Sequence, residues 1–412
     1  MKKYCFSISL LLFTFYIFLT STAIAITLNA ESCSLSHVQS AINVARTGDA
    51  VVLPAGSSTW NSTLSIPNDK KITIQGSGIG NTIITRNSYG TFIKLNKSGS
   101  RITAIEFVEG KIEADGYDFR IDHCQISLNV WSDGISVMSR DINPPVISTG
   151  LIDNCIFNNM RILVCGTNWM LSDNNAQHVL WSSPLGLGTA EAVYIEDNTF
   201  NGGHSVIDGN YAGRYVFRHN TVNDASIDAH SVQGNNRAIR KWEIYNNTIN
   251  QEKKSMWVPM FIRGGTGVIF NNVVTGTWTN PNIAFDNVRS CLSRGDGGMC
   301  DGNSSWDGNE ANQIGYPCRD QIGRSTDKWL WTTEKPYPPQ ALDPAYIWNN
   351  KWGNSDVAVF QHNCSTNALH IQKDRDFYLN IPKPGYTPYI YPHPLRASDK
   401  NKPSAPTGFK KI

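Results

Sequence analysis

The chain has 412 residues, which is enough for one large domain or two ordinary ones. Only 17% of the residues are charged, the formal net charge is +2, and no long basic tract occurs, so nucleic acid is not an expected partner. Glycine is plentiful, at 33 residues, which suits a fold with many tight turns because glycine tolerates positive φ.

The first 25 residues have the organisation of a secretory signal peptide. Lys2 and Lys3 precede an apolar run over 6–19, and small residues then lead to an Ala-Ile-Ala cleavage signal at 23–25. The run is shorter than the roughly 20 residues that a membrane-spanning helix needs. We therefore expect cleavage after residue 25, a mature protein that begins near Ile26 and has no membrane partner, and a location that is secreted, periplasmic or on the cell surface.

Eight cysteines remain after the signal peptide, an even number that permits disulfides in an exported protein. The best candidates for bridges lie in or after a loop-rich region: Cys291, Cys300, Cys318 and Cys364. No Cys-x-x-Cys pair occurs, which argues against a zinc site.

The mature chain is expected to begin with an amphipathic helix. Ser34 is a suitable N-cap, and the apolar residues of 35–45 recur at i, i+3 and i+4 spacing. Short strands are predicted over 50–53, 72–75, 83–84 and 92–95. A helix in this place would cap a stack of strands, because the end of such a stack exposes apolar side chains and unpaired backbone.

One phrase of six residues then recurs along the chain. It consists of an apolar residue, two variable positions, Asn, one variable position and a second apolar residue. The copies start at 121, 152, 195, 217, 244, 269 and 347, and those at 121 and 152 carry Cys in place of Asn. Intervals of 22, 27 and 25 residues separate the four copies from 195 to 269. A repeat of this length predicts an architecture of stacked coils.

The phrase also predicts the geometry of a coil. One coil would contain three short strands and three turns, and the two apolar positions would face inward. The fixed Asn would lie at the bend, where left-handed backbone is tolerated, and bond to the Asn of the next coil about 4.8 Å away. Cys124 and Cys155 would occupy the same ladder, where we expect packed thiols rather than a disulfide.

On these features the chain resembles the right-handed parallel β-helix proteins of the pectate-lyase-like superfamily. The helix followed by Gly-Asp-Ala-Val-Val-Leu-Pro-Ala-Gly at 48–56 is similar to the start of many secreted or phage-borne members. The closing segment at 386–395 resembles the tail of many bacterial members. The resemblance implies an all-β fold, a right-handed parallel β-helix in a single domain over 26–400, with glycan-binding and catalytic residues on one long parallel sheet and its adjoining loops.

Two segments depart from the repeat. Residues 275–345 hold three cysteines and several tryptophans, and a structureless loop of this length is uncommon unless it is functional. We expect this segment to be an excursion folded over the coils and held by disulfides. After Asp374 the chain is rich in Pro and Tyr and is expected to run back along the β-helix or to close its C-terminal end, with 401–412 as a disordered tail.

Polar residues gather in the intervals between the phrases. We align 207–210 with 227–230 and 262–265, which predicts two outward columns: Asp208, Asp228 and Arg263 in one, and Asn210, His230 and Gly265 in the next. Neighbouring carboxylates perturb each other's pKa, and arginine binds sugar carboxylates bidentately. The predicted catalytic residues are Asp208, Asp228, His230 and Arg263; the predicted substrate-binding residues are His204, Asn210, Arg214, Arg237, Arg240 and Trp257.

Two chemistries fit this set of side chains. A lyase acting on a uronic-acid polymer would neutralise the sugar carboxylate with Arg or a metal and remove the C5 proton with a base such as His230 or an Arg. A hydrolase would pair a protonated Asp with a second carboxylate. The alternative without chemistry is a solvated ladder of ion pairs, which any β-helix can carry.

Signatures of two particular families are incomplete. Ile-Asp-His at 121–123 is similar to a pectate lyase signature, but Arg120 replaces the expected Trp, and no Arg-x-Pro-x-x-Arg segment occurs. The paired Asp and the Gly-His-Gly of polygalacturonases are also missing, because Ser231 follows His230. Neither specific activity is predicted, and His123 is expected to flank the ladder.

No metal-binding residue is assigned, and calcium is kept only as a secondary expectation. Five residues in the excursion offer oxygen ligands at close spacing: Asp296, Asp301, Asn303, Asp307 and Glu310. Trp306 takes the place where an EF-hand needs Gly, so the similarity to a calcium loop is loose.

The leading prediction is a secreted, monomeric, carbohydrate-active β-helix protein. It would bind a polysaccharide and act as a polysaccharide lyase on a uronic-acid-containing polymer, or as a related glycoside hydrolase. The alternative is a non-catalytic protein that binds glycans or serves a structural role at the cell surface.

Overall fold

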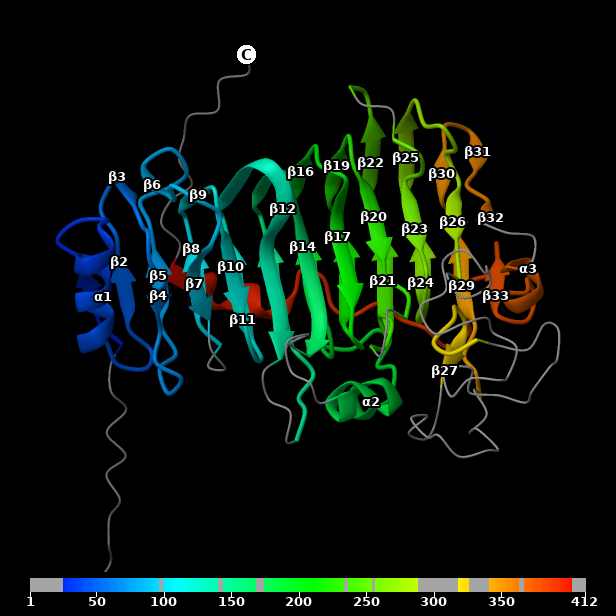
Figure 1. Ribbon diagram of the computed structural model, residues 1–412, viewed down its shortest axis with the longest axis horizontal. Coiled ribbons are helices and arrows are strands. Elements are labelled where there is room, and N and C mark those ends of the chain that lie inside the picture. Colours follow the sequence, from blue (N-terminus) through cyan, green and yellow to red (C-terminus); the bar gives the residue numbers. More distant parts are fainter. Residues whose placement is uncertain are drawn as a thin grey trace, which may run out of the picture.

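The computed structural model describes residues 25–95, 99–139, 144–167, 174–232, 236–253, 256–287, 318–325, 341–362 and 367–401. Within these ranges short strands pair mainly in parallel and stack into two long sheets, of 12 and 19 strands (Figure 1). In each central coil one strand joins the 12-stranded sheet and the next two join the 19-stranded sheet, so the described chain winds as a parallel β-helix. The prediction of an all-β fold built from stacked coils is confirmed.

The 12-stranded sheet consists of β1 (Thr27–Asn29), β2 (Ala50–Val52), β5 (Thr73–Gln75), β8 (Arg101–Thr103), β11 (Phe119–Asp122), β13 (Gly150–Asp153), β15 (Val193–Glu196), β18 (Arg214–Arg218), β21 (Lys241–Tyr245), β24 (Thr266–Phe270), β29 (Ala345–Trp348) and β33 (Phe377–Leu379). We call it the strap sheet, because the C-terminal segment runs along it. The helices are α1 (Leu35–Val44), α2 (Asn174–Ser182), α3 (Asn367–His370) and the 3-10 helix η2 (Pro394–Asn401).

The 19-stranded sheet, called the site sheet below, consists of β3 (Gly56–Thr59), β4 (Leu64–Ser65), β6 (Thr82–Thr85), β7 (Thr91–Leu95), β9 (Glu106–Val108), β10 (Lys111–Ala114), β12 (Gln125–Ser139), β14 (Ile156–Thr167), β16 (Thr199–Asn201), β17 (Ser205–Asn210), β19 (Thr221–Asn223), β20 (Ser226–Ala229), β22 (Thr248–Gln251), β23 (Met260–Ile262), β25 (Val273–Gly276), β26 (Ile283–Phe285), β30 (Lys351–Trp352), β31 (Ser355–Asp356) and β32 (Val359–Gln361). A separate antiparallel pair joins β27 (Arg324–Ser325) to β28 (Ala341–Leu342).

Each central coil contributes three strands, as predicted from the repeat. One coil consists of β18, β19 and β20, and the next consists of β21, β22 and β23. Phe217 pairs with Ile244, Val222 with Ile249, and Ile227 with Met260. The inward apolar residues of one coil therefore stack on the inward apolar residues of the next, and together they form one continuous buried core along the stack.

The repeated Asn forms a buried ladder at the first bend of each coil. Nδ2 of Asn198 donates to Oδ1 of Asn220 at 3.1 Å, and the same contact joins Asn220 to Asn247 at 3.2 Å and Asn247 to Asn272 at 2.9 Å. The left-handed backbone, however, belongs to the residue before each ladder Asn, as at Asp197 with φ 58°. The ladder is confirmed, and the position predicted for the left-handed residue was wrong by one.

Cys124 and Cys155 occupy the same ladder as buried free thiols, as predicted. The backbone N–H of Cys124 donates to Sγ of Cys155, with the two atoms 3.4 Å apart. In the next coil Oδ1 of Asn198 accepts from the N–H of Cys155 at 2.9 Å. A thiol thus substitutes for the amide in the two earlier coils, which is consistent with the weaker form of the repeat there.

The predicted N-terminal helix is present as α1, at the end of the stack (Figure 1). Oγ of Ser34 accepts from the N–H of His37, and Val38, Ala41 and Ile42 are buried against the first coil. The helix therefore forms for the reasons read from the sequence, a side-chain N-cap and an apolar face. Its role as a cap on the strand stack stays a prediction.

The C-terminal segment 386–397, called the strap below, runs back along the outer face of the strap sheet (Figure 1). The hydroxyl of Tyr386 donates to Glu243 at 2.5 Å, and Arg218 donates to the carbonyls of Tyr389 and Ile390 at 2.8 and 2.9 Å. Further along, Arg120 donates to the carbonyl of Leu395. The prediction that this segment returns along the β-helix is confirmed.

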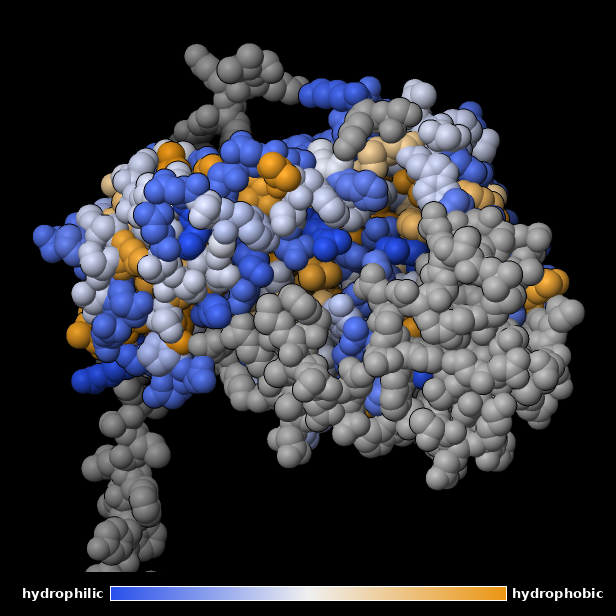
Figure 2. Space-filling model, viewed as in Figure 1, coloured by the Kyte–Doolittle hydropathy of each residue, from blue (hydrophilic) through white to orange (hydrophobic). Residues whose placement is uncertain are grey.

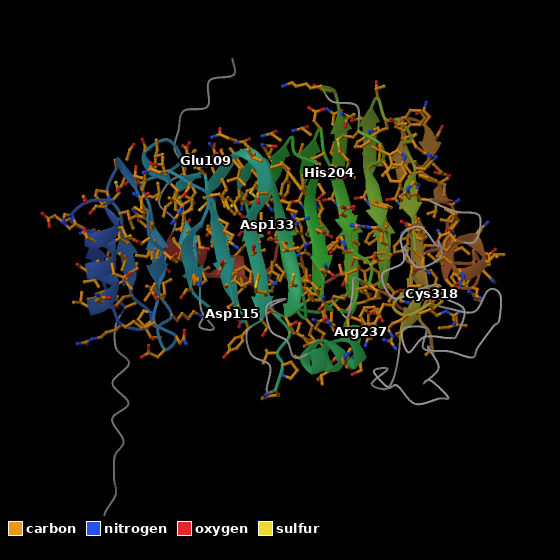
Figure 3. All side chains as sticks on the ribbon, in the orientation of Figure 1. Glu109, Asp115, Asp133, His204, Arg237 and Cys318 are labelled. Atoms are coloured by element: carbon orange, nitrogen blue, oxygen red, sulfur yellow. The ribbon has the colours of Figure 1, made fainter. Side chains whose placement is uncertain are left out.

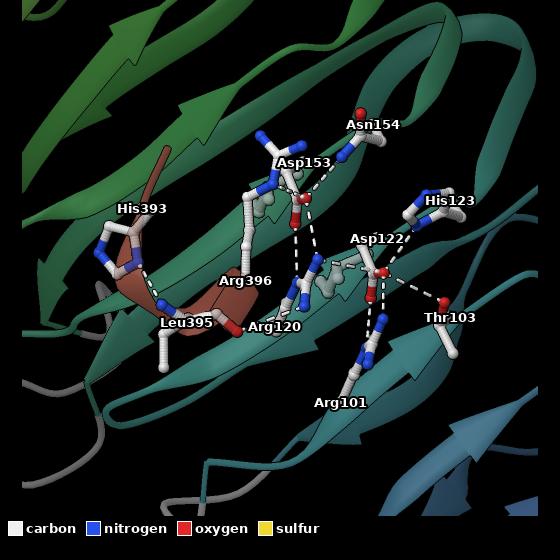
Figure 4. A network of polar contacts seen from close by, with 12 residues as sticks. Arg101, Thr103, Arg120, Asp122, His123, Asp153, Asn154, His393, Leu395 and Arg396 are labelled. Atoms are coloured by element: carbon white, nitrogen blue, oxygen red, sulfur yellow. Dashed lines mark hydrogen bonds and ion pairs between the residues drawn. The ribbon is translucent and has the colours of Figure 1, made fainter. Parts of the chain in front are cut away.

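A line of buried ion pairs lies beneath the strap, and sequence reasoning did not foresee it. Arg120 pairs with Asp153 at 2.9 Å, Arg101 pairs with Asp122 at 2.5 Å, and Arg396 of the strap reaches Asp153 at 3.5 Å (Figure 4). Burial acts to raise the pKa of Asp122, but the hydrogen bonds from Arg101 and His123 and the positive charge of Arg120 outweigh it and lower this pKa to about 2. His123 thus flanks the ladder, at the bend, as expected.

Several predicted features lie outside the described residues. They include the signal peptide up to residue 24, most of the excursion (288–317 and 326–340), the tail from 402, Cys291, Cys300 and Cys364, and the candidate calcium ligands Asp296, Asp301, Asn303, Asp307 and Glu310. Cys318 is described and is disulfide-bonded, whereas the other three candidate cysteines lie outside the described residues, so their participation in disulfides stays a prediction. No helix in the described ranges is long and apolar enough to cross a membrane.

Candidate functional site

Asp208 and Asp228 lie side by side on neighbouring strands of the site sheet. Ile207 of β17 pairs with Ile227 of β20, so the residue after each occupies the same outward position. The two aspartates are only 3% and 6% exposed, yet Oδ1 of each is buried without a hydrogen-bond partner. Buried polar atoms are nearly always paired, because an unpaired one costs free energy. Two such oxygens at one place therefore mark a position where a bound water or a ligand would complete the bonding.

His230 and Arg263 join the two carboxylates into one cluster. Nδ1 of His230 lies 3.2 Å from Oδ2 of Asp208. Nη2 of Arg263 lies 2.8 Å from the same Nδ1 and 3.4 Å from Oδ2 of Asp228, and its Nε has no partner. We call Asp208, Asp228, His230 and Arg263 the acid–base cluster. The structure thus brings together the four residues predicted to be catalytic.

The register predicted for Arg263 was wrong by two residues. Asp228 pairs with Phe261, and Ala229 pairs with Ile262, so Arg263 follows in the column of His230 rather than that of the aspartates. The prediction placed Ile262 opposite Ile227, but the residue opposite Ile227 is Met260 of β23. Arg263 still reaches Asp228 because its side chain is long enough to contact a diagonal neighbour.

The surroundings drive the pKa values of the two aspartates apart. Burial raises the pKa of Asp228 to about 6; Arg263 opposes the shift, and the charge of Asp208 adds to it. Burial also acts to raise the pKa of Asp208, but His230, Arg263 and Arg161 together outweigh burial and hold this pKa below its usual value. In mildly acidic solution Asp208 is therefore ionised while Asp228 keeps its proton.

Asp133 and Arg161 extend the cluster toward the N-terminal coils, and sequence reasoning missed both. Nε of Arg161 donates to Asp133 at 2.6 Å, and its Nη1 donates to Asp208 at 3.3 Å. The guanidinium also lies over the ring of Trp131, 5.0 Å from its centre. β12 and β14 pair with an irregular register around these residues, so simple alternation along the strands does not predict the contact.

His204 and Trp257, predicted to bind substrate, lie on opposite sides of the acid–base cluster. His204 is exposed, and its ring lies 5.5 Å from that of Trp131; Figure 3 shows His204 and Asp133 on the same face. Trp257 lies 5.2 Å from the ring of Phe261. Asn210 shares the outward column of His230, although its side chain accepts a hydrogen bond from its own neighbour in the chain.

Arg214, Arg237 and Arg240, also predicted to bind substrate, lie elsewhere and are buried. Arg214 donates to four backbone carbonyls in and after α2. Arg237 forms a bidentate pair with Asp320 at 2.5 and 2.7 Å, and Arg240 donates to the carbonyl of Trp181 at 2.8 Å. Figure 3 shows Arg237 beside α2, away from His204. These arginines anchor α2 and residues 318–325 to the coils, so we leave them out of the site.

The surface over these strands is mixed in character. Figure 2 shows hydrophilic side chains gathered in the middle of this face, with hydrophobic patches beside them. Within the described ranges no group of three or more His, Cys, Asp or Glu side chains is placed to hold a metal ion. The calcium expectation concerned residues outside these ranges and is untested.

Comparisons with known proteins give distant structural similarity only. No protein family and no curated protein matches the sequence. Among solved structures, an alginate lyase from Paenibacillus sp. str. FPU-7 is 15% identical, with 81% of this chain and 97% of that chain covered and a TM-score of 0.38. The catalytic domain of a GH87 α-1,3-glucanase in complex with tetrasaccharides is 11% identical, with 87% and 68% covered and a TM-score of 0.31. Similarity at this level does not assign an activity.

Proposed function

We propose that the protein is an exported, monomeric enzyme that cleaves a polysaccharide by glycoside hydrolysis at the acid–base cluster. The observation that carries the proposal is the pair of buried carboxylates on adjacent coils, each with one oxygen that has no partner. Hydrolysis of a glycosidic bond needs two carboxyl groups in different protonation states. Asp208 and Asp228 differ in this way, because their surroundings shift their pKa values in opposite directions.

Asp228 is the general acid in this proposal. Its raised pKa keeps a proton available in mildly acidic solution, and its free Oδ1 can pass that proton to the glycosidic oxygen as the bond to the anomeric carbon breaks. Arg263 contacts the other oxygen and so fixes the orientation of the carboxyl group.

Asp208 is the nucleophile. Arg161 contacts its Oδ2 and stabilises the charge, as does His230 when its Nδ1 is protonated, which leaves Oδ1 to attack the anomeric carbon and form a glycosyl–enzyme ester. Neighbouring strands are about 4.8 Å apart, close to the roughly 5 Å that separates the carboxyl groups of retaining enzymes. Asp228, now ionised, would take a proton from water as that water attacks and releases Asp208.

Elimination from a uronic-acid polymer is the second candidate. It is favoured by Arg263, whose Nε is buried without a partner and could bind a sugar carboxylate, and by His230 beside it, whose Nδ1 could remove the C5 proton once Arg263 turns from it to the sugar.

The test incubates the mature protein with neutral and uronate polysaccharides. New reducing ends without ultraviolet absorbance support hydrolysis, whereas absorbance from unsaturated chain ends would replace it with elimination. Retention on a glycan array without any cleavage would instead support the non-catalytic alternative. Export is tested separately, by mass spectrometry of the exported protein, whose N-terminus is expected near Ile26.

A further inference from the structure

Aromatic rings flank the acid–base cluster on both sides along the stack. On the N-terminal side lie Trp131 and His204, with ring centres 5.5 Å apart; we call this pair the Trp131 flank. On the other side the ring of Trp257 lies 5.2 Å from Phe261, 5.9 Å from Phe360 and 4.2 Å from His362; we call these four residues the Trp257 flank. His204 is exposed and the other five are half-buried, so their rings are accessible in part from solvent.

Each flank is joined to the cluster by an arginine that lies over a ring. Arg161 lies 5.0 Å from the ring centre of Trp131 and contacts Asp208. Arg263 lies 4.7 Å from the ring centre of Phe261 and contacts Asp228. Rings and carboxylates therefore form one continuous surface across β12, β14, β17, β20 and β23. The backbones of these five strands span four steps of about 4.8 Å, or about 19 Å, and the ring of Trp131 reaches from β12 to β17.

Backbone contacts hold the ring of Trp131 in place. The indole N–H of Trp131 donates to the carbonyl of Ser205 at 3.1 Å. A Cβ on Gly203 would lie 2.8 Å from the indole, and the φ of this glycine is 104°. The chain thus places a residue without a side chain under the ring. The hydroxyl of Ser205 is also buried without a partner, which adds a polar atom beside the ring.

The charges of this surface do not favour a polyanion. With Asp228 protonated, the charges of Asp133 and Asp208 are balanced by the guanidinium groups of Arg161 and Arg263, and both of these already contact carboxyl groups. A uronate polymer would bring more negative charge to a place where the described residues hold no surplus of positive charge. A neutral pyranose, by contrast, presents an apolar face that packs on an aromatic ring and hydroxyls that satisfy unpaired polar atoms.

We propose that the two aromatic flanks are binding subsites for a neutral polysaccharide on either side of the cleaved bond, so that the enzyme cuts inside the chain. This inference rests on the proposed function for the position of the cleaved bond. The binding itself does not depend on catalysis, so the two can fail separately.

The test measures binding by the full mature protein carrying Asp208→Asn, which is expected to slow turnover strongly. The probes are hexasaccharides of neutral glucan, mannan and xylan, and a hexasaccharide of polygalacturonate, followed by tryptophan fluorescence and calorimetry. At least one neutral hexasaccharide is expected to bind, about tenfold or more tightly than the uronate. Trp131→Ala and Trp257→Ala are each expected to weaken this binding by about three- to tenfold.

Trp352 provides the matched control, because it is a 41% exposed tryptophan on β30, outside both flanks. Trp352→Ala should bind as tightly as the parent. Trp131→Phe and Trp257→Phe, which keep a ring, should recover most of the affinity, and thermal unfolding checks that all variants are folded. The inference is overturned if no neutral hexasaccharide binds, if the uronate binds as tightly, or if the two Trp→Ala variants behave like Trp352→Ala.

The experiment distinguishes failure of the proposed function from failure of the binding subsites. Binding that depends on Trp131 and Trp257, with no cleavage by the unmodified protein, would support the subsites and overturn the proposed function. If the unmodified protein cleaves a polysaccharide but Trp131→Ala and Trp257→Ala bind it as tightly as the parent, the proposed function is supported and the subsites are overturned.

Discussion

Nη2 of Arg263 lies 2.8 Å from Nδ1 of His230. A guanidinium group can only donate hydrogen bonds, so Nδ1 must accept, and the neutral imidazole carries its proton on Nε2. Oδ2 of Asp208 lies 3.2 Å from the same Nδ1, and this contact becomes a hydrogen bond only when Nδ1 is protonated. His230 therefore has two alternative partners, Arg263 when it is neutral and Asp208 when it is charged.

His230→Ala is expected to raise the pKa of Asp208, because the charge and hydrogen bond of His230 lower that pKa against the effect of burial. The low-pH limb of the kcat/KM profile, which reports ionisation of Asp208, should move to higher pH. His37→Ala, on α1 and far from the cluster, is the control and should leave the limb in place. An unmoved limb in His230→Ala would mean that this histidine does not set the charge of Asp208.

Asp208→Asn and Asp228→Asn should each lower kcat by about 10²- to 10⁴-fold, the range typical for loss of one acid–base group. The control is Asp356→Asn, because Asp356 forms an exposed ion pair with Lys351 outside the cluster. The rates are measured as release of reducing ends, and thermal unfolding is measured in parallel. Full activity in both cluster variants would place the reaction elsewhere.

The activity should fall as the pH rises through about 6, because Asp228 then loses the proton that it donates. The free energy of unfolding also depends on the protonation of Asp228. The folded-state pKa of Asp228 lies above the ordinary value of 3.8, so the folded protein binds this proton more tightly than the unfolded chain does. That contribution is fully present below pH 3.8 and is lost as the pH rises through about 6.

Urea unfolding at several pH values checks this second effect. The free energy of unfolding should fall more steeply between these two pH values in the unmodified protein than in Asp228→Asn, which has no proton to lose. Equal slopes would contradict a raised pKa at this position.

Asn247→Ala should lower the free energy of unfolding by about 1 to 3 kcal/mol, the cost of unpaired buried polar groups. Oδ1 of Asn247 accepts from the N–H of Asn220 at 2.9 Å, and its Nδ2 donates to the carbonyl of Phe217 at 2.9 Å. Asn250→Ala is the matched control, since Asn250 is half-buried and lies outside the ladder. Urea unfolding of both variants measures the difference, and equal losses would remove the special role of the ladder.

Arg218→Ala should be more damaging, by about 3 to 5 kcal/mol, because it leaves the buried carboxylate of Glu196 without this partner and frees the strap. Arg218 is fully buried, lies 2.6 Å from Glu196, and donates to two carbonyls of the strap. Lys351→Ala breaks an exposed ion pair and should cost no more than about 1 kcal/mol. Limited proteolysis near residue 390 should also accelerate only in the Arg218 variant.

The sequence by itself determined the coils. The spacing of the apolar residues and of Asn198, Asn220, Asn247 and Asn272 was enough to predict three strands per coil and a buried amide ladder, because these features depend on neighbours that recur at nearly constant separation. The sequence also predicted that Asp208 and Asp228 lie together, because each follows an isoleucine, Ile207 or Ile227, at the same position of its coil.

Only the tertiary structure decided which other charged residues join them. Arg161 comes from a coil whose longer strands pair with register shifts, and Arg263 lies two positions from its expected column, so neither contact follows from the repeat. Arg214, Arg237 and Arg240 were predicted for the site on proximity in sequence, but their guanidinium groups are bound by carbonyls or carboxylates around α2. The physical reason is reach: long side chains bond to whatever acceptor the folded chain brings near, and a repeat specifies only the direction in which they leave the backbone.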